Sequence, residues 1–225
     1  AYSLRVPIEA RAKDRIKEVQ TTTSQDNRHN INEALWDFYL GKRPDHQGRY
    51  IGAIWDFNND QLEQEHDYIQ LLFPNEELGQ FFIFSFIGRK AGDMVLPVFS
   101  KEDIAMLQGN SDEAIQFRAN MLNSLDLMLN FYGLQYGFAN GGVIIEPSPA
   151  FNKRKLNWLA ESNHNFLRIT RILKALNLAG LDKYTMTLFE CLSKLYEDEK
   201  YRLIIDDSFE FWEKAVQDIK ANKRL

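Results

Sequence analysis

The longest amphipathic stretch of the chain, residues 110–133, most constrains its fold. Its apolar side chains follow one another at intervals of three and four, the spacing that gathers them on one face of an α-helix. We expect Asn110 and Glu113 to cap this helix and Gly133 to end it. The apolar face comprises Ala114, Phe117, Met121, Leu125, Met128 and Tyr132, widened by Ile115, Leu122 and Leu129. A helix with so broad an apolar face is expected at the centre of a protein.

Helical spacing recurs along most of the remaining sequence. It predicts helices near residues 8–19, 31–39, 49–57, 58–73, 100–107, 162–178, 184–195 and 207–219. Asn58 with Gln61, and Ser100 with Asp103, have the spacing of helix-capping pairs, and Ser162 is the expected cap of a later helix. The sequence therefore predicts a mainly α fold, a compact multi-helix domain over residues 30–222 preceded by a polar N-terminal arm, residues 1–29.

One segment, residues 81–98, departs from the helical spacing. Residues 81–87 read FFIFSFI, and residues 94–98 read MVLPV, with glycines between them. Two extended runs around a polar turn are typical of a small β-hairpin, although a buried helical segment fits a run this short as well. Because it is strongly aromatic, the 81–87 segment is also a hypothetical surface for binding another protein.

Composition excludes several classes of protein. The net charge is −5 and there is one cysteine, Cys191, so neither an internal disulfide nor a multi-cysteine zinc site is expected. No apolar run reaches the roughly 18 residues that crossing a bilayer requires. The basic Lys153–Lys155 run is a weak signal for nucleic acid against this acidic background. We expect a soluble intracellular protein without a cofactor, and the sequence does not indicate an oligomeric state.

The residue patterns of common catalytic sites are missing from the sequence. There is no nucleophile elbow, zinc-binding H-E-x-x-H helix or P-loop, and the glycines at 139–142 are expected to form a turn. Cys191 has apolar helical neighbours and is expected to be a packed thiol. Among the histidines, His46 is expected in solvent and His66 partly buried. A small-ligand or metal-assisted enzyme site around His66 and His164 is the alternative from another functional class.

Two charged segments each allow two interpretations. The acidic residues between 56 and 67 form either a solvated helix face or a surface that attracts a cationic ligand, such as a peptide amine beside Trp55 or Tyr68. His164, Arg168 and Arg171 are spaced to share one face of a helix. That face could bind a carboxylate or phosphate, or pair with acidic residues of another helix.

Two longer motifs resemble one known family. The first runs from Glu63 through His66 and Tyr68 to Pro74 (ExxHxYIQxLFP), and the second combines Leu156-Asn157-Trp158 with the run from Ser162 to Lys174 (SxHNxLRITRILK). Together they resemble the conserved domain of the opioid growth factor receptor family, in the family's order and across most of the chain. The resemblance implies a divergent member of that family, of eukaryotic or bacterial origin.

The resemblance implies a helical domain with a binding role and no enzymatic activity. Familiar members are receptors for a Met-enkephalin-type peptide that act in growth regulation and associate with the nuclear envelope and nucleus, whereas a bacterial member would be cytoplasmic. We therefore expect a receptor-like domain for a peptide or protein partner. The candidate ligand-binding residues are Glu63, His66, Tyr68, Gln70, Trp158, His164, Asn165, Arg168 and Arg171. The alternative is that both motifs pack in the core and define the fold.

Overall fold

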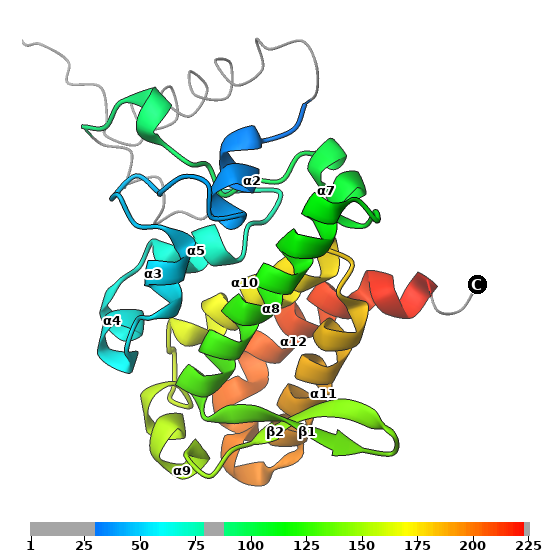
Figure 1. The fold of residues 1–225 in the computed structure, drawn as a ribbon. Coiled ribbons are helices and arrows are strands. Elements are labelled where there is room, and N and C mark those ends of the chain that lie inside the picture. Colours follow the sequence, from blue (N-terminus) through cyan, green and yellow to red (C-terminus); the bar gives the residue numbers. More distant parts are fainter. Residues whose placement is uncertain (1–29, 79–87, 223–225) are drawn as a thin grey trace, which may run out of the picture. The chain divides into compact units, whose positions relative to one another are not determined.

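The computed structural model describes residues 30–78 and 88–222 (Figure 1). The chain divides into two compact units, residues 1–117 and 118–225. The boundary falls within the long helix α8, Asp112–Tyr132, so the first turns of α8 belong to the first unit and the rest to the second. The expected arm of residues 1–29 and its helix lie outside the described residues.

The first unit is built from short helices joined by turns. In chain order these elements are α2 (Glu33–Tyr39), α3 (Ile51–Trp55), α4 (Asn59–Gln64), α5 (Tyr68–Leu72), the 3₁₀ turn η1 (Ala91–Asp93) and α7 (Lys101–Leu107). Two predicted capping pairs are confirmed. Asn58 and Gln61 exchange hydrogen bonds at the start of α4, as Ser100 and Asp103 do at the start of α7.

Aromatic rings form the core of the first unit. Phe117 stacks on Tyr39, with ring centroids 4.1 Å apart, and meets Trp36 edge-on at 4.7 Å. The fully buried Asp103 carboxylate accepts hydrogen bonds from the Trp36 indole at 2.9 Å and from the backbone N–H of Asn32 at 3.0 Å. The carboxylate that caps α7 therefore also fixes the beginning of α2.

The structure corrects the helix predicted over residues 58–73. The chain leaves helical geometry at Glu65, whose ψ is 139°, and resumes it in α5. The break lets Asp67 turn into a buried polar cluster, which a continuous helix would not allow. It also leaves His66 exposed, so the expectation that this ring is partly buried was wrong.

The second unit packs three helices against one another and against a hairpin. After α8 come β1 (Leu134–Ala139), β2 (Gly142–Pro147), α9 (Phe151–Arg154), the 3₁₀ turn η2 (Lys155–Asn157), α10 (Asn165–Leu178), α11 (Asp182–Glu197) and α12 (Glu199–Asn222). Helices α10, α11 and α12 contact each other pairwise, and β2 lies against α11 (Figure 1). The last helix begins well before the predicted start near residue 207.

The predicted stripe of α8 is largely confirmed. All six residues of its apolar face are buried, and the helix ends at Gly133, which has a φ of +75°. Of the three flanking residues, Leu129 is buried, Leu122 is half-buried and Ile115 has 49% of its surface exposed. The helix was expected to be capped by Asn110. The cap is instead the next residue, Ser111, whose hydroxyl accepts the hydrogen bond from the Ala114 N–H.

The mainly α fold class with a small β-hairpin is confirmed. The hairpin was predicted near residues 81–98, whereas the one found among the described residues is formed by β1 and β2, at 134–147. Asn140 and Gly141 have φ values of 52° and 76°, so they form the two-residue turn that matches the twist of an antiparallel pair. The turn predicted at 139–142 is thus confirmed. Residues 81–87 lie outside the described part, and in the 94–98 run only Val98 forms a bridge, with Asn75.

Candidate functional site

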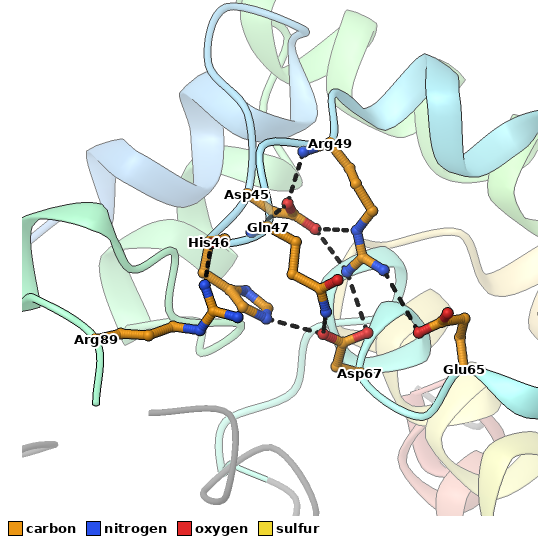
Figure 2. Close-up of polar contacts among 7 residues, drawn as sticks. All are labelled: Asp45, His46, Gln47, Arg49, Glu65, Asp67 and Arg89. Atoms are coloured by element: carbon orange, nitrogen blue, oxygen red, sulfur yellow. Dashed lines mark hydrogen bonds and ion pairs between the residues drawn. The ribbon is translucent and has the colours of Figure 1, made fainter. Parts of the chain in front are cut away.

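A buried polar cluster in the first unit surrounds the carboxylate of Asp67 (Figure 2). One carboxylate oxygen accepts hydrogen bonds from His46 Nε2, at 2.8 Å, and from the side-chain amide of Gln47. The other accepts from the Arg49 guanidinium at 3.1 Å. Glu65 lies at the edge of the cluster, 3.9 Å from Arg49. Three donors from one turn therefore converge on one carboxylate.

The turn that supplies these donors is organised by Asp45. Its carboxylate accepts hydrogen bonds from the backbone N–H groups of Gln47 and Arg49, and it pairs with the Arg49 side chain at 2.7 Å. Gly48 adopts a φ of +77°, a conformation that favours glycine. Asp45 thus bends the backbone so that His46, Gln47 and Arg49 all face Asp67.

The charges of the cluster are compensated internally. Burial on its own would raise the pKa of Asp67, but the hydrogen bond from His46 and the charge of Arg49 hold that pKa well below its usual range. Burial on its own would lower the pKa of Arg49, and the bonds to Asp45 and Asp67 raise it instead. Because a carboxylate only accepts hydrogen bonds, His46 Nε2 carries the hydrogen in its bond to Asp67.

Two arginine side chains form hydrogen bonds between residues 43–46, at the start of this turn, and the segment around residues 89–92. Arg89 donates to the backbone carbonyl of His46, and Arg43 donates to the carbonyl of Gly92 at 3.2 Å. The expectation that His46 lies in solvent was wrong, since its side chain is fully buried. A turn rich in polar residues looks solvated in sequence, and only the position of Asp67 shows why this imidazole is enclosed.

The residues predicted from the first motif divide between core and surface. Tyr68 is buried, and its hydroxyl donates to the carbonyl of Leu62 at 2.7 Å, which holds α5 against α4. Gln70 is also buried. Glu63 is half-buried and His66 is exposed.

The residues predicted from the second motif hold the C-terminal end of α8 in the second unit. The Trp158 indole donates to the carbonyl of Tyr132 at 3.0 Å. The Asn165 side-chain oxygen accepts from the Tyr132 hydroxyl at 3.3 Å and from Arg168 at 3.4 Å. Arg154, just before the motif, donates to the carbonyl of Phe131 at 2.7 Å. Carbonyls that the end of a helix leaves without intrahelical partners are bonded in this way.

The predicted basic face is only partly correct. His164 is exposed and Arg171 is half-buried, but Arg168 lies inside, with 6% of its surface exposed. Successive residues of an α-helix are rotated by 100° about its axis, which brings Arg168 closer in angle to the buried Ile172 than to Arg171. Arg168 therefore lies on the buried side of α10 and not on a shared basic face. Ser162 does not cap α10, because the side chain of Asn163 accepts the hydrogen bond from the Asn165 N–H.

The two motifs fall in different units of the chain. His66 belongs to the first unit and His164 to the second, and both are exposed. Within residues 30–78 and 88–222, no three His, Cys, Asp or Glu side chains are grouped in a way that could hold a metal ion. Burial raises the pKa of the Cys191 thiol to about 12, which agrees with its expected role as a packed side chain.

Sequence reasoning missed Asp45, His46, Gln47 and Arg49. The only sign of this cluster in the sequence was the run of residues 45–49, in which Gly48 follows three polar residues and precedes Arg49. That pattern is common in exposed loops, so it could not identify a buried cluster. The missing information was the break at Glu65, which brings Asp67 to the turn.

Comparisons with known proteins agree with the motif resemblance. A family model described as the Opioid growth factor receptor (OGFr) conserved region matches residues 28–225. The opioid growth factor receptor of Mus musculus is 35% identical over 134 residues, covering 60% of this chain and 18% of that protein. The opioid growth factor receptor-like protein 1 of Xenopus tropicalis is 32% identical over 153 residues, covering 65% and 26%.

A longer match is found with the opioid growth factor receptor-like protein 1 of Rattus norvegicus, which is 28% identical over 201 residues and covers 84% of this chain and 37% of that protein. The chain thus spans well under half the length of these relatives. They are vertebrate proteins named as receptors or receptor-like, and they do not support the expectation of a bacterial origin. No solved structure matches the chain. Among the described helices, none is both long and apolar enough to cross a membrane.

Proposed function

Because the chain belongs to the opioid growth factor receptor conserved-region family, we propose that it is a non-enzymatic, receptor-like domain that binds a peptide or protein partner. The observation that carries this proposal is the family match over nearly the whole chain. The names of the relatives add to it, since they describe receptors rather than enzymes. The single buried cysteine fits a reducing compartment, so action inside the cell is part of the proposal.

We place the peptide at an acidic surface of the first unit formed by Trp55, Asp56 and Asp60. Both carboxylates are exposed, and the indole, which precedes Asp56 in the chain, is half-exposed. Asp67, in contrast, is already neutralised by Arg49. A peptide ammonium group would be attracted to the exposed carboxylates, and an aromatic peptide side chain could pack on the indole.

The motif residues take two roles in this proposal. Buried residues position the backbone, and residues that reach the surface are the candidates for contact with the partner. Positioning residues are Tyr68, Gln70, Trp158, Asn165 and Arg168, and candidate contacts are Glu63, His66, His164 and Arg171.

Calorimetric titration of the full chain with the peptide Tyr-Gly-Gly-Phe-Met tests the proposal. We expect saturable heat with this peptide and none with a scrambled peptide. The double variant Asp56→Asn/Asp60→Asn should weaken binding by about two- to thirty-fold, because it removes two exposed charges that attract the peptide amine.

The matched control is Asp207→Asn/Glu213→Gln, which changes two exposed charges on α12 in the same direction. We expect this control to bind the peptide as the unmodified chain does. Equal weakening by both variants would refute the acidic surface as the binding place. Absence of saturable heat with the unmodified chain would refute the peptide-binding function itself.

A further inference from the structure

The hairpin of the second unit has one edge that no described strand pairs with. Among the described residues β1 pairs with β2 only, in an antiparallel register that sets Phe138 opposite Val143 (Figure 1). The outer edge of β2 is different, because β2 lies against α11 and the Thr187 hydroxyl donates to the carbonyl of Val143 at 3.4 Å. The open edge of the hairpin therefore lies along β1, and we call it the β1 edge.

The register fixes which backbone groups face outward on the β1 edge. The two-residue turn at 140–141 makes Ala139 and Gly142 the hydrogen-bonded closing pair of the hairpin. Pairs along an antiparallel ladder alternate between hydrogen-bonded and non-hydrogen-bonded ones. Tyr136 and Phe138 therefore belong to non-hydrogen-bonded pairs, and their N–H and C=O groups point away from β2. A row of outward donors and acceptors with this spacing is what a further β-strand bonds to.

One face of the β1 edge is aromatic. Tyr136 and Phe138 are two residues apart, so their side chains share a face of the hairpin. Tyr136 is half-buried, with its ring 6.2 Å from that of Tyr184 on α11. Phe138 lies nearer the turn, and 85% of its surface is exposed. β1 also lacks the Lys or Pro that commonly keeps other strands from an open edge.

The other face of the β1 edge carries a carboxylate without a cation. A Cβ on Gly137 would lie 2.6 Å from Glu146 Oε1, so the end of this β2 side chain occupies the space over the glycine. The half-buried Glu146 accepts a long hydrogen bond, 3.4 Å, from the side-chain amide of Gln135. No described Lys, Arg or His forms an ion pair with it. A cation placed beside Gly137 would therefore meet an uncompensated negative charge.

We propose that the β1 edge binds an extended segment of a partner protein in which one basic residue stands between two apolar residues. The segment adds a strand antiparallel to β1, and its backbone bonds the outward groups of Tyr136 and Phe138. Its basic side chain lies opposite Gly137 and pairs with Glu146, while its apolar side chains pack beside the two aromatic rings on the other face. This site belongs to the second unit and goes beyond the peptide surface proposed on the first.

Other occupants fit the β1 edge less well. A second copy of this chain, paired through its own β1, would add another Glu146 to the same face and no cation, because β1 has no Lys or Arg. A nucleic acid or an anionic membrane would be repelled by the same carboxylate, and neither bonds a row of backbone groups. A basic and apolar strand satisfies the backbone, the carboxylate and the rings together.

The test is a nuclear magnetic resonance titration of the full chain with the peptide acetyl-Thr-Val-Lys-Val-Thr-amide. We expect saturable shifts of the Tyr136 and Phe138 backbone amides, with a dissociation constant of about 0.1–1 mM because so short a strand buries a small area. The counterpart peptide with Glu in place of Lys should leave these amides unshifted. The double variant Phe138→Ser/Glu146→Gln should weaken binding of the Lys peptide by about two- to thirty-fold.

A matched control makes the same two changes on α12. Phe211 and Glu213 are both exposed there, so the control is Phe211→Ser/Glu213→Gln. It should bind the Lys peptide as the unmodified chain does, and circular dichroism should show that both variants are folded. Equal weakening by both variants, equal shifts with the Glu peptide, or no saturable shift on β1 would overturn the proposal. Shifts of the same amides on raising the concentration of the chain alone would overturn it in favour of self-pairing.

Discussion

Replacing Asp67 by alanine should destabilise the first unit strongly. The change removes the acceptor of three side-chain hydrogen bonds, from His46, Gln47 and Arg49, at a carboxylate whose side chain is only 10% exposed. Breaking a buried ion pair costs about 3–5 kcal/mol. Arg49 keeps its bonds to Asp45 at 2.7 Å, so we expect the lower end of that range, about 3 kcal/mol.

Urea unfolding followed by tryptophan fluorescence measures this loss. With a slope of about 2–3 kcal/mol per molar urea, a loss of about 3 kcal/mol lowers the midpoint by about 1–1.5 M. The control is Asp60→Ala, which removes an exposed carboxylate of the same unit and should change stability by less than about 0.5 kcal/mol. A loss below about 1 kcal/mol for Asp67→Ala would refute the central place given to this carboxylate.

The same carboxylate predicts a dependence on pH. The folded pKa of Asp67 is lowered from its ordinary value of 3.8, so its contribution to stability is present above that value and is lost as the pH falls below it. The stability difference between the unmodified chain and Asp67→Asn should therefore narrow in acid. A difference that stays constant from neutral pH to well below 3.8 would contradict this assignment.

Three further outcomes are expected. Gly133→Ala should destabilise the second unit by at least about 2 kcal/mol in a thermal melt, because φ is +75° and a Cβ would lie 2.7 Å from the Cα of Phe151; no loss would contradict the close approach. Trp158→Phe should cost about 1–3 kcal/mol in urea unfolding, since it deletes the bond to the Tyr132 carbonyl, and an unchanged midpoint would contradict that role. Cys191, with its pKa raised to about 12, should resist alkylation by iodoacetamide until the chain is unfolded, and rapid labelling of the native chain would count against its burial.

The sequence predicted best what depends on local spacing. The stripe of α8 and the capping pairs at Asn58 and Ser100 are set by residues three or four apart, and the structure has them as expected. The break at Glu65 was not predictable in this way. Leu62, Ile69 and Phe73 are buried and keep a helical spacing across the break, so periodicity alone favours one continuous helix.

The buried polar cluster around Asp67 could not be predicted from local residue spacing either. Asp67 was considered only as part of an acidic stretch, and His46 only as a residue in a polar loop. Their hydrogen bond joins positions 21 residues apart through the turn at Asp45 and the break at Glu65. For the second motif, Trp158 and Asn165 were considered as candidate ligand-binding residues, with packing in the core as the alternative; both are buried, and their polar groups are hydrogen-bonded to Tyr132.

An amide-resolved nuclear magnetic resonance titration of the full chain with Tyr-Gly-Gly-Phe-Met tests the receptor-like function most directly. We predict saturable shifts of the Trp55 indole N–H and of backbone amides near Asp56 and Asp60, and no shifts with the scrambled peptide. Shifts that never saturate, that appear equally with the scrambled peptide, or that spare this acidic surface would contradict the account.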